Sequence, residues 1–157
     1  DNKVEVEYDG NLVAPVAVEL RQWPVRRKVA KGKDAVLTIA REVAAEGALG
    51  EPLTVELTVA SSKTVPYVEI LESVPSTVAV DKRSLDELVD SGAIQGYQIV
   101  DGQVALFMHK LDGETKLSYK VLATREGTGH HGGTRVVARF HQEFGVARFI
   151  GGPITVN

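Results

Sequence analysis

Apolar and polar residues alternate along the segment Leu53–Val59. Its leucines and valines fall on one side of an extended chain, and its threonines and glutamate fall on the other. A period of two is typical of a half-buried strand, because successive side chains of a strand point to opposite faces. The segment therefore predicts a strand with one face in a core.

Two further segments extend this pattern. Val68–Leu71 predicts a second strand, which ends near Pro75 because proline has no backbone N–H to donate. The polar residues Ser61–Thr64 predict a turn between these two strands, which would then pair. Lys116–Ala123 alternates again and predicts a third strand. We expect an all-β, antiparallel core in which two sheets pack face to face.

Similar signals predict the remaining strands. Asp101-Gly102 predicts a hairpin turn, because this dipeptide tolerates the positive φ angles of a type I′ turn, and Asp112-Gly113 repeats the signal. Asp34–Ala45 has mixed propensities, and the sandwich context favours a strand. The other expected strands are Lys3–Tyr8, Leu12–Leu20, Tyr97–Val100, Val104–His109, Arg135–Phe140, Phe144–Ile150 and Ile154–Val156.

One short helix is predicted, inserted between strands near residues 84–91. Ser84 as N-cap and Glu87 have the spacing of a capping box, and Gly92 is placed to end the helix in a left-handed conformation. We expect this helix to cover an open end of the sandwich. The acidic residues of this segment could bind calcium, but no D-x-D-x-D-G motif supports a calcium site. Solvation of the carboxylates and their favourable interaction with the helix dipole explain these acids better. These acids are Asp81, Asp86, Glu87 and Asp90.

The most distinctive local sequence is Gly127–Gly133, with four glycines and the adjacent histidines His130 and His131. Adjacent histidines suggest a metal site, and a hydrolase or metal-dependent enzyme using them is a distant alternative. Neighbouring side chains in extended chain point in opposite directions, however, and His109 and His141 lie on other predicted strands. We favour a flexible hairpin tip, with no metal or cofactor site.

Residues 1–24 form an extended segment that precedes the sandwich pattern of residues 25–157. Pro15 interrupts the second of its two predicted strands, which is typical of an edge strand. A strand outside its own sandwich can pair with the open edge of a neighbouring subunit. The alternative is that both strands belong to one enlarged sandwich.

A basic cluster follows this segment. A solvated strand face explains it most simply, and salt bridges to carboxylates of an adjacent subunit are the alternative. The cluster consists of Arg26, Arg27, Lys28, Lys31 and Lys33.

Composition narrows the classes of function. A chain of 157 residues is sufficient for one domain. A net charge of −3 does not favour binding to the negatively charged backbone of nucleic acids. No apolar run is long enough to span a membrane. Cysteine is absent, so packing alone must stabilise the fold. Because the sequence opens at Asp1, we expect a secretion signal to have been removed, and the scarcity of methionine and asparagine fits a thermostable protein.

Catalytic motifs are missing from the sequence. It contains no G-x-S-x-G elbow, H-E-x-x-H, Walker loop or G-x-G-x-x-G after a strand. The acidic pairs fall on a solvated helix, and short loops between alternating strands are typical of a scaffold. We expect no enzymatic activity and name no catalytic residue.

Four pieces of sequence over roughly residues 35–139 occur in a recognisable order, namely Thr38–Val43, Leu53–Val59, Ile70–Pro75 and Gly113–Val121. They correspond to strands with a "T-V-x-L-x-V" pattern, an "E-x-V/L-P" corner and a "G-E-T-x-x-x-S-Y-x-V" hairpin. This order resembles the immunoglobulin-like repeat modules of secreted prokaryotic surface proteins, including adhesin stalks, and a domain of macroglobulins. The resemblance implies an immunoglobulin-like sandwich and brings no catalytic residues. Pro75-Ser76-Thr77, where "P-A-G" is typical, and the helical insertion depart from the pattern.

These inferences lead to a structural role. We expect a secreted or cell-surface subunit whose partners are copies of itself, joined by β-strand addition into a filament or pilus-like homopolymer. The donor would be Lys3–Tyr8 or Leu12–Leu20. The alternative is a stalk or adhesin module of a larger cell-surface protein.

Overall fold

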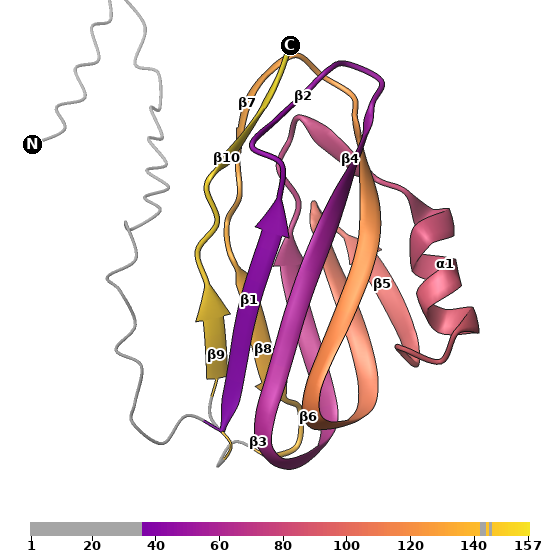
Figure 1. Cartoon of the computed structure of the whole chain (residues 1–157), viewed down its shortest axis with the longest axis vertical. Coiled ribbons are helices and arrows are strands. Elements are labelled where there is room, and N and C mark those ends of the chain that lie inside the picture. The colour runs from indigo at the N-terminus through magenta and orange to yellow at the C-terminus, as the bar shows by residue number, and fades with distance from the viewer. Residues whose placement is uncertain (1–35, 142–143, 145) are drawn as a thin grey trace, which may run out of the picture.

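The computed structural model describes residues 36–141, 144 and 146–157, which form a two-layer β-sandwich (Figure 1). Two long antiparallel strands, β3 (Pro52–Ser73) and β6 (Gln103–Ala123), run through both layers. They pair along their length, from Pro52 opposite Leu122 to Ser73 opposite Gln103. The prediction of an antiparallel all-β sandwich is therefore confirmed.

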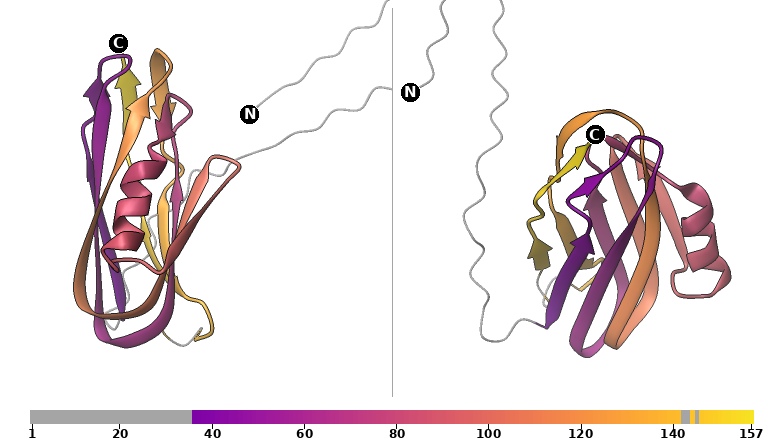
Figure 2. Two further views of the ribbon diagram at one scale, coloured as in Figure 1. Left: turned by 90° about the vertical axis from the view of Figure 1, so that its right-hand side faces the viewer. Right: turned by 45° about the horizontal axis from the view of Figure 1, so that its top comes forward.

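Both long strands bend together at one end of the sandwich, as the edge-on view shows (Figure 2). The pairing shifts register between Ser61 and Val65 of β3, and Gly113 of β6, with a φ of 73°, lies opposite Ser61. We call this bend the fold-over. It places the first half of β3 in one layer and the second half in the other.

The fold-over corrects two expectations. Ser61–Thr64 is not a turn between two strands that pair with each other, because each half of β3 pairs with a different half of β6. Asp112-Gly113 likewise lies within β6 and does not separate two strands. A polar break in an alternating pattern marks a change of direction. Whether the chain reverses or only bends there depends on which strand it pairs with, and this pairing is not determined by the local sequence.

The remaining strands complete the sandwich. β1 pairs with the first half of β3, and β8 with the second half; β4 and β5 pair with β6, and β9 with β8. Their bounds are β1 (Leu37–Val43), β4 (Val78–Val80), β5 (Gly96–Val100), β8 (Thr134–Ala138) and β9 (Val146–Phe149). A three-stranded sheet is formed by β2 (Glu46–Gly47), β10 (Pro153–Val156) and β7 (Gly127–His130).

The local predictions agree with the structure at one hairpin turn and at several strands. The turn at Asp101-Gly102 is confirmed, because both residues have positive φ angles, 49° and 73°, between β5 and β6. The strands predicted around β1, β8, β9 and β10 are also present. The flexible tip predicted for Gly127–Gly133 is wrong, because Gly127–His130 is strand β7 and pairs with β10.

The predicted helix is present as α1 (Lys82–Asp90), but two details differ. Its N-cap is Asp81, whose side chain accepts a hydrogen bond from the Arg83 N–H, so Ser84 is not the cap. Ser84 lies inside the helix, donates from Oγ to Asp81 O and accepts from the Lys120 N–H of β6. The helix lies beside β5 and β6 rather than over an end of the sandwich (Figure 1). Gly92 has a φ of 75°, as the C-terminal prediction required.

The core lies between the two layers and is formed by the inward-facing rows of the strands. Burying one such leucine or isoleucine contributes about 1.5–3 kcal/mol. The largest fully buried apolar residues include Leu57, Ile70, Leu85, Leu106, Leu111 and Leu117. Among the described residues, no helix is long and apolar enough to cross a membrane.

Some predictions made from the sequence concern residues that the structure does not describe. The two predicted N-terminal strands, the basic cluster and the boundary at residue 24 lie outside the described residues. Strand addition through residues 1–24 therefore stays a prediction.

Candidate functional site

One carboxylate, that of Glu72, is buried between the two layers and is only 1% exposed. Glu72 follows Val68 and Ile70 at the inward-facing positions of β3, so the alternation of the strand carries it into the core. A buried charge is costly unless it is paired and hydrogen-bonded. Its partners therefore decide whether this carboxylate is reactive or structural.

Three side chains donate hydrogen bonds to Glu72, and they come from both layers. Arg41 Nε of β1 and Tyr119 OH of β6 donate to Oε1, at 2.6 and 3.0 Å. Thr134 Oγ1 of β8 donates to Oε2 at 2.6 Å. Each donor occupies an inward-facing position of its own strand. Together with His131, these residues form what we call the Glu72 cluster.

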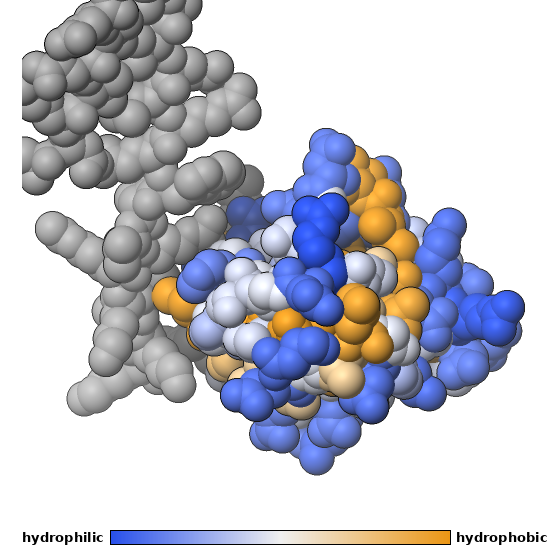
Figure 3. All heavy atoms as spheres, turned by 90° about the horizontal axis from the view of Figure 1, so that it is seen from above, coloured by the Kyte–Doolittle hydropathy of each residue, from blue (hydrophilic) through white to orange (hydrophobic). Residues whose placement is uncertain are grey.

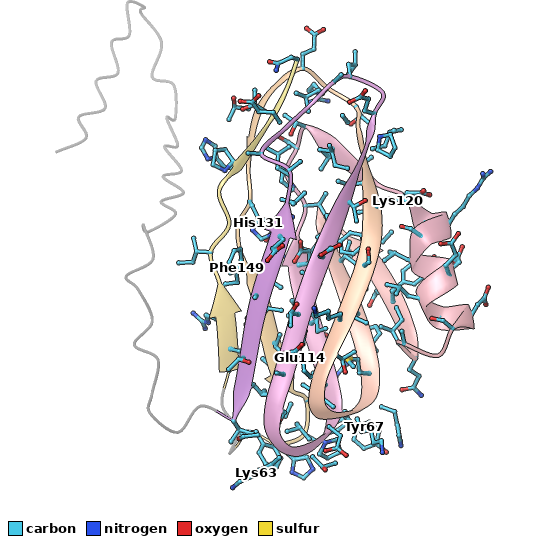
Figure 4. The ribbon with its side chains drawn as sticks, in the orientation of Figure 1. Lys63, Tyr67, Glu114, Lys120, His131 and Phe149 are labelled. Carbon is cyan, nitrogen blue, oxygen red and sulfur yellow. The ribbon has the colours of Figure 1, made fainter. Side chains whose placement is uncertain are left out.

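His131, labelled in Figure 4, lies between β7 and β8 in the chain, and its ring packs against Glu72. Its Nδ1 accepts a hydrogen bond from the Gly133 N–H at 3.2 Å, which assigns the ring proton of the neutral form to Nε2. Nε2 lies 3.4 Å from Glu72 Oε1 and has no well-formed hydrogen bond with the described residues. Gly151 covers the ring closely, because a Cβ at that position would lie 2.5 Å from Nδ1.

The surroundings shift the pKa of both acidic groups in the cluster. Burial alone would raise the pKa of Glu72, but His131, the positive charge of Arg41 and the Thr134 hydroxyl lower it below its usual value of about 4.5. The contact with His131 is long, so we attribute the lowering mainly to Arg41 and Thr134. Burial, followed by the charge of Glu72, raises the pKa of Tyr119 well above its usual value.

This arrangement is suited to structure rather than to catalysis. Glu72 is an ionised acceptor whose two oxygens already receive hydrogen bonds, and solvent hardly reaches it. A general base must reach the proton that it abstracts, and the cluster leaves no such path. We infer that the cluster ties the two layers together.

The residues singled out from the sequence do not converge on one site. His130 is exposed and His131 is buried, in agreement with the expected opposite directions of neighbouring side chains. The acids of α1 act separately: Asp81 caps the helix, and Asp86 accepts a hydrogen bond from Tyr97 OH at 2.7 Å. Within the described part of the chain, no three His, Cys, Asp or Glu residues gather as metal ligands.

Aromatic side chains gather at the fold-over end of the sandwich. Tyr67, in a left-handed conformation with a φ of 50°, contacts the rings of His109 and Phe140 edge-on at centroid distances of 5.2 and 5.4 Å. Arg139 lies over the ring of Phe107. A hollow of about 300 Å³ is bordered by part of this group.

The Glu72 cluster was not predicted from the sequence, although the sequence contains a pattern that indicates it. Arg41 is in phase with Leu37 and Ile39, and Glu72 is in phase with Val68 and Ile70. A charged residue in phase with an apolar face is expected to be buried. Two such residues of opposite sign predict a buried pair. Which strands bring them together is decided only by the fold.

Comparisons with known proteins support the fold. No family model matches the sequence, and no curated protein matches it. Among solved structures, a fragment of Escherichia coli α2-macroglobulin spanning the residues from domain MG7 to the C-terminus matches with a TM-score of 0.64 at 17% identity. The match covers 78% of this chain and 23% of that one.

Two other structures give the same result. A Salmonella α2-macroglobulin mutant matches with a TM-score of 0.64 at 19% identity, over 78% of this chain and 9% of its own. The native conformation of Escherichia coli α2-macroglobulin matches with a TM-score of 0.62 at 16% identity, over 78% of this chain and 9% of its own. This chain therefore spans less than a quarter of the length of each of these structures. It is an immunoglobulin-like β-sandwich, similar in fold to a domain-sized part of bacterial α2-macroglobulins.

Proposed function

We propose that this chain is a non-catalytic structural module of a larger extracellular protein. The observation that carries the proposal is the fold match, in which 78% of the chain corresponds to between 9% and 23% of the bacterial α2-macroglobulin chains. The resemblance to modules of secreted surface proteins supports an extracellular setting. In this role the module positions its neighbours.

The Glu72 cluster supports such a role. Arg41 and Tyr119 lie in one layer and Glu72 lies in the other, so the hydrogen bonds from Arg41 and Tyr119 to Glu72 cross the core. Thr134 holds the carboxylate from within the layer of Glu72 itself. The continuous strands β3 and β6 add covalent connections between the same layers at the fold-over. A sandwich tied at both places resists sliding of one layer over the other, which suits a spacer or stalk.

The end of the sandwich opposite the fold-over offers a surface for a neighbouring domain. Seen from above, apolar side chains lie among polar ones at this end (Figure 3). Leu49, in the turn before β3, and Leu122, near the end of β6, are 50% and 40% exposed. Contacts between domains of one chain are of modest size and mixed polarity, as this surface would provide.

Concentration-dependent size tests the proposal against the filament alternative. We would measure mass by light scattering over a wide range of concentration, and image the same samples by electron microscopy, for the full chain and for a variant lacking residues 1–24. The module predicts a monomer whose association state does not change with the deletion. Filaments that grow with concentration and disappear on the deletion would overturn it in favour of a homopolymer.

A further inference from the structure

A shallow hollow of about 250 Å³ opens on the outer face of the layer that contains β8 and β9. Arg135 and Arg148 border it and are exposed, while Thr134 and Ala147 beside them in sequence point inward and are buried. The rest of the lining carries no charge. It consists of Leu71, Ser73, Gln103, Gly132 and Gly133.

The two arginines lie directly opposite each other in the pairing of β8 with β9. Like charges in directly opposite positions on one face destabilise a sheet. Neither arginine forms an ion pair with a carboxylate of the described residues. Glu69 lies on the same face of β3, but it is opposite Val137 rather than Arg135. Two positive charges are therefore held side by side with no ion-pair partner among the residues that the structure describes.

The wall of the hollow is fixed in place and carries neutral hydrogen-bonding groups. The Gly133 N–H donates to His131 Nδ1, and its carbonyl accepts from the Ser73 N–H at 3.2 Å. A Cβ at Gly132 would lie 2.7 Å from Ser73 Oγ, so glycine is required for this close approach. The Ser73 hydroxyl and the Gln103 amide can donate to a ligand.

We propose that this hollow binds an oxyanion between Arg135 and Arg148, either a carboxylate or a sulfate or phosphate group. Guanidinium groups donate paired hydrogen bonds to such anions, and an anion would also relieve the repulsion between the arginines. The volume fits a small group rather than a drug-sized ligand. The proposal goes beyond the function proposed above, because it does not require a larger parent protein.

NMR titration of the full chain tests the site directly. The probes are acetate, sulfate and phosphate, each compared with chloride at equal ionic strength. We expect saturable shifts of the Gly132 and Gly133 amides and of the arginine Nε–H signals. The Arg135→Gln and Arg148→Gln variants should each bind about tenfold more weakly or worse, because a charge-assisted hydrogen bond is lost. Arg83→Gln removes an exposed arginine of α1 and should bind like the wild type.

Thermal unfolding gives a second readout that does not depend on signal assignment. A bound oxyanion should raise the Tm of the wild type and of Arg83→Gln more than that of Arg148→Gln. Relative binding of acetate against sulfate and phosphate then identifies the class of group. The proposal is overturned if chloride reproduces the effects at equal ionic strength, or if both hollow variants respond like the wild type.

Discussion

Arg41 Nε donates a hydrogen bond to Glu72 Oε1 at 2.6 Å, between side chains that are 3% and 1% exposed. The pair joins β1 in one layer to the second half of β3 in the other. Moving two charges out of water costs several kcal/mol per ion, so such a pair contributes little net stability while it is intact. Breaking it is costly, because one buried charge is then left without its partner.

Removing either member of the pair should destabilise the fold strongly. We expect Arg41→Met and Glu72→Gln each to lower the free energy of unfolding by about 3–5 kcal/mol. The double variant should be less destabilised than Arg41→Met alone, because the neutral amide that replaces the carboxylate leaves no unpaired charge in the core. Urea unfolding measures all three variants. Glu56→Gln, on the exposed face of β3, is the control and should change stability by no more than about 0.5 kcal/mol. Additive effects of the two substitutions would contradict the coupling.

Acid should weaken the fold through Glu72. Its pKa is lower in the folded chain than its usual value of about 4.5, so the unfolded state binds more protons in acid and stability rises with pH in that range. The contribution is fully present above about pH 4.5 and is lost as the pH falls through the lower, folded value. Plots of unfolding free energy against pH across this range should have a shallower slope for Glu72→Gln than for the wild type. Identical slopes for the two proteins would refute the assignment.

The glycines that follow β9 should respond differently to alanine. A Cβ at Gly151 would lie 2.5 Å from His131 Nδ1, whereas a Cβ at Gly152 would meet nothing within 4 Å. We expect Gly151→Ala to cost about 1–3 kcal/mol through overpacking, and Gly152→Ala to be neutral or slightly stabilising. Thermal unfolding measures both. Equal effects would mean that the ring of His131 is not packed against Gly151.

At position 67 we expect glycine to be more stabilising than alanine, although strands usually favour alanine over glycine. The φ of Tyr67, 50°, is in the left-handed region, where a Cβ costs about 1 kcal/mol. Both Tyr67→Ala and Tyr67→Gly lose the edge-on contacts with His109 and Phe140, so their difference isolates the backbone strain. We expect the glycine variant to be the more stable of the two by about 1 kcal/mol in urea unfolding. The same pair at Glu56 should show the opposite order.

Much of the sandwich could be predicted from local pattern. The alternation along Leu53–Val59 places four apolar side chains in the core, and Asp101-Gly102 forms the expected hairpin turn. The helix was predicted correctly, but its N-cap was not. Asp81 and Ser84 are both good capping residues, and a contact with β6 through the Lys120 N–H occupies Ser84 inside the helix. A local motif cannot reveal such a competing partner.

Which segments are extended, and which of their side chains face inward, can be read from the sequence, because a strand's period of two is a property of the local chain. The course of β3 through the fold-over, and the meeting of Arg41 with Glu72 across the core, depend on pairing between segments far apart in the chain. Register and layer are set by the combined burial of all the strands, and no single segment encodes them.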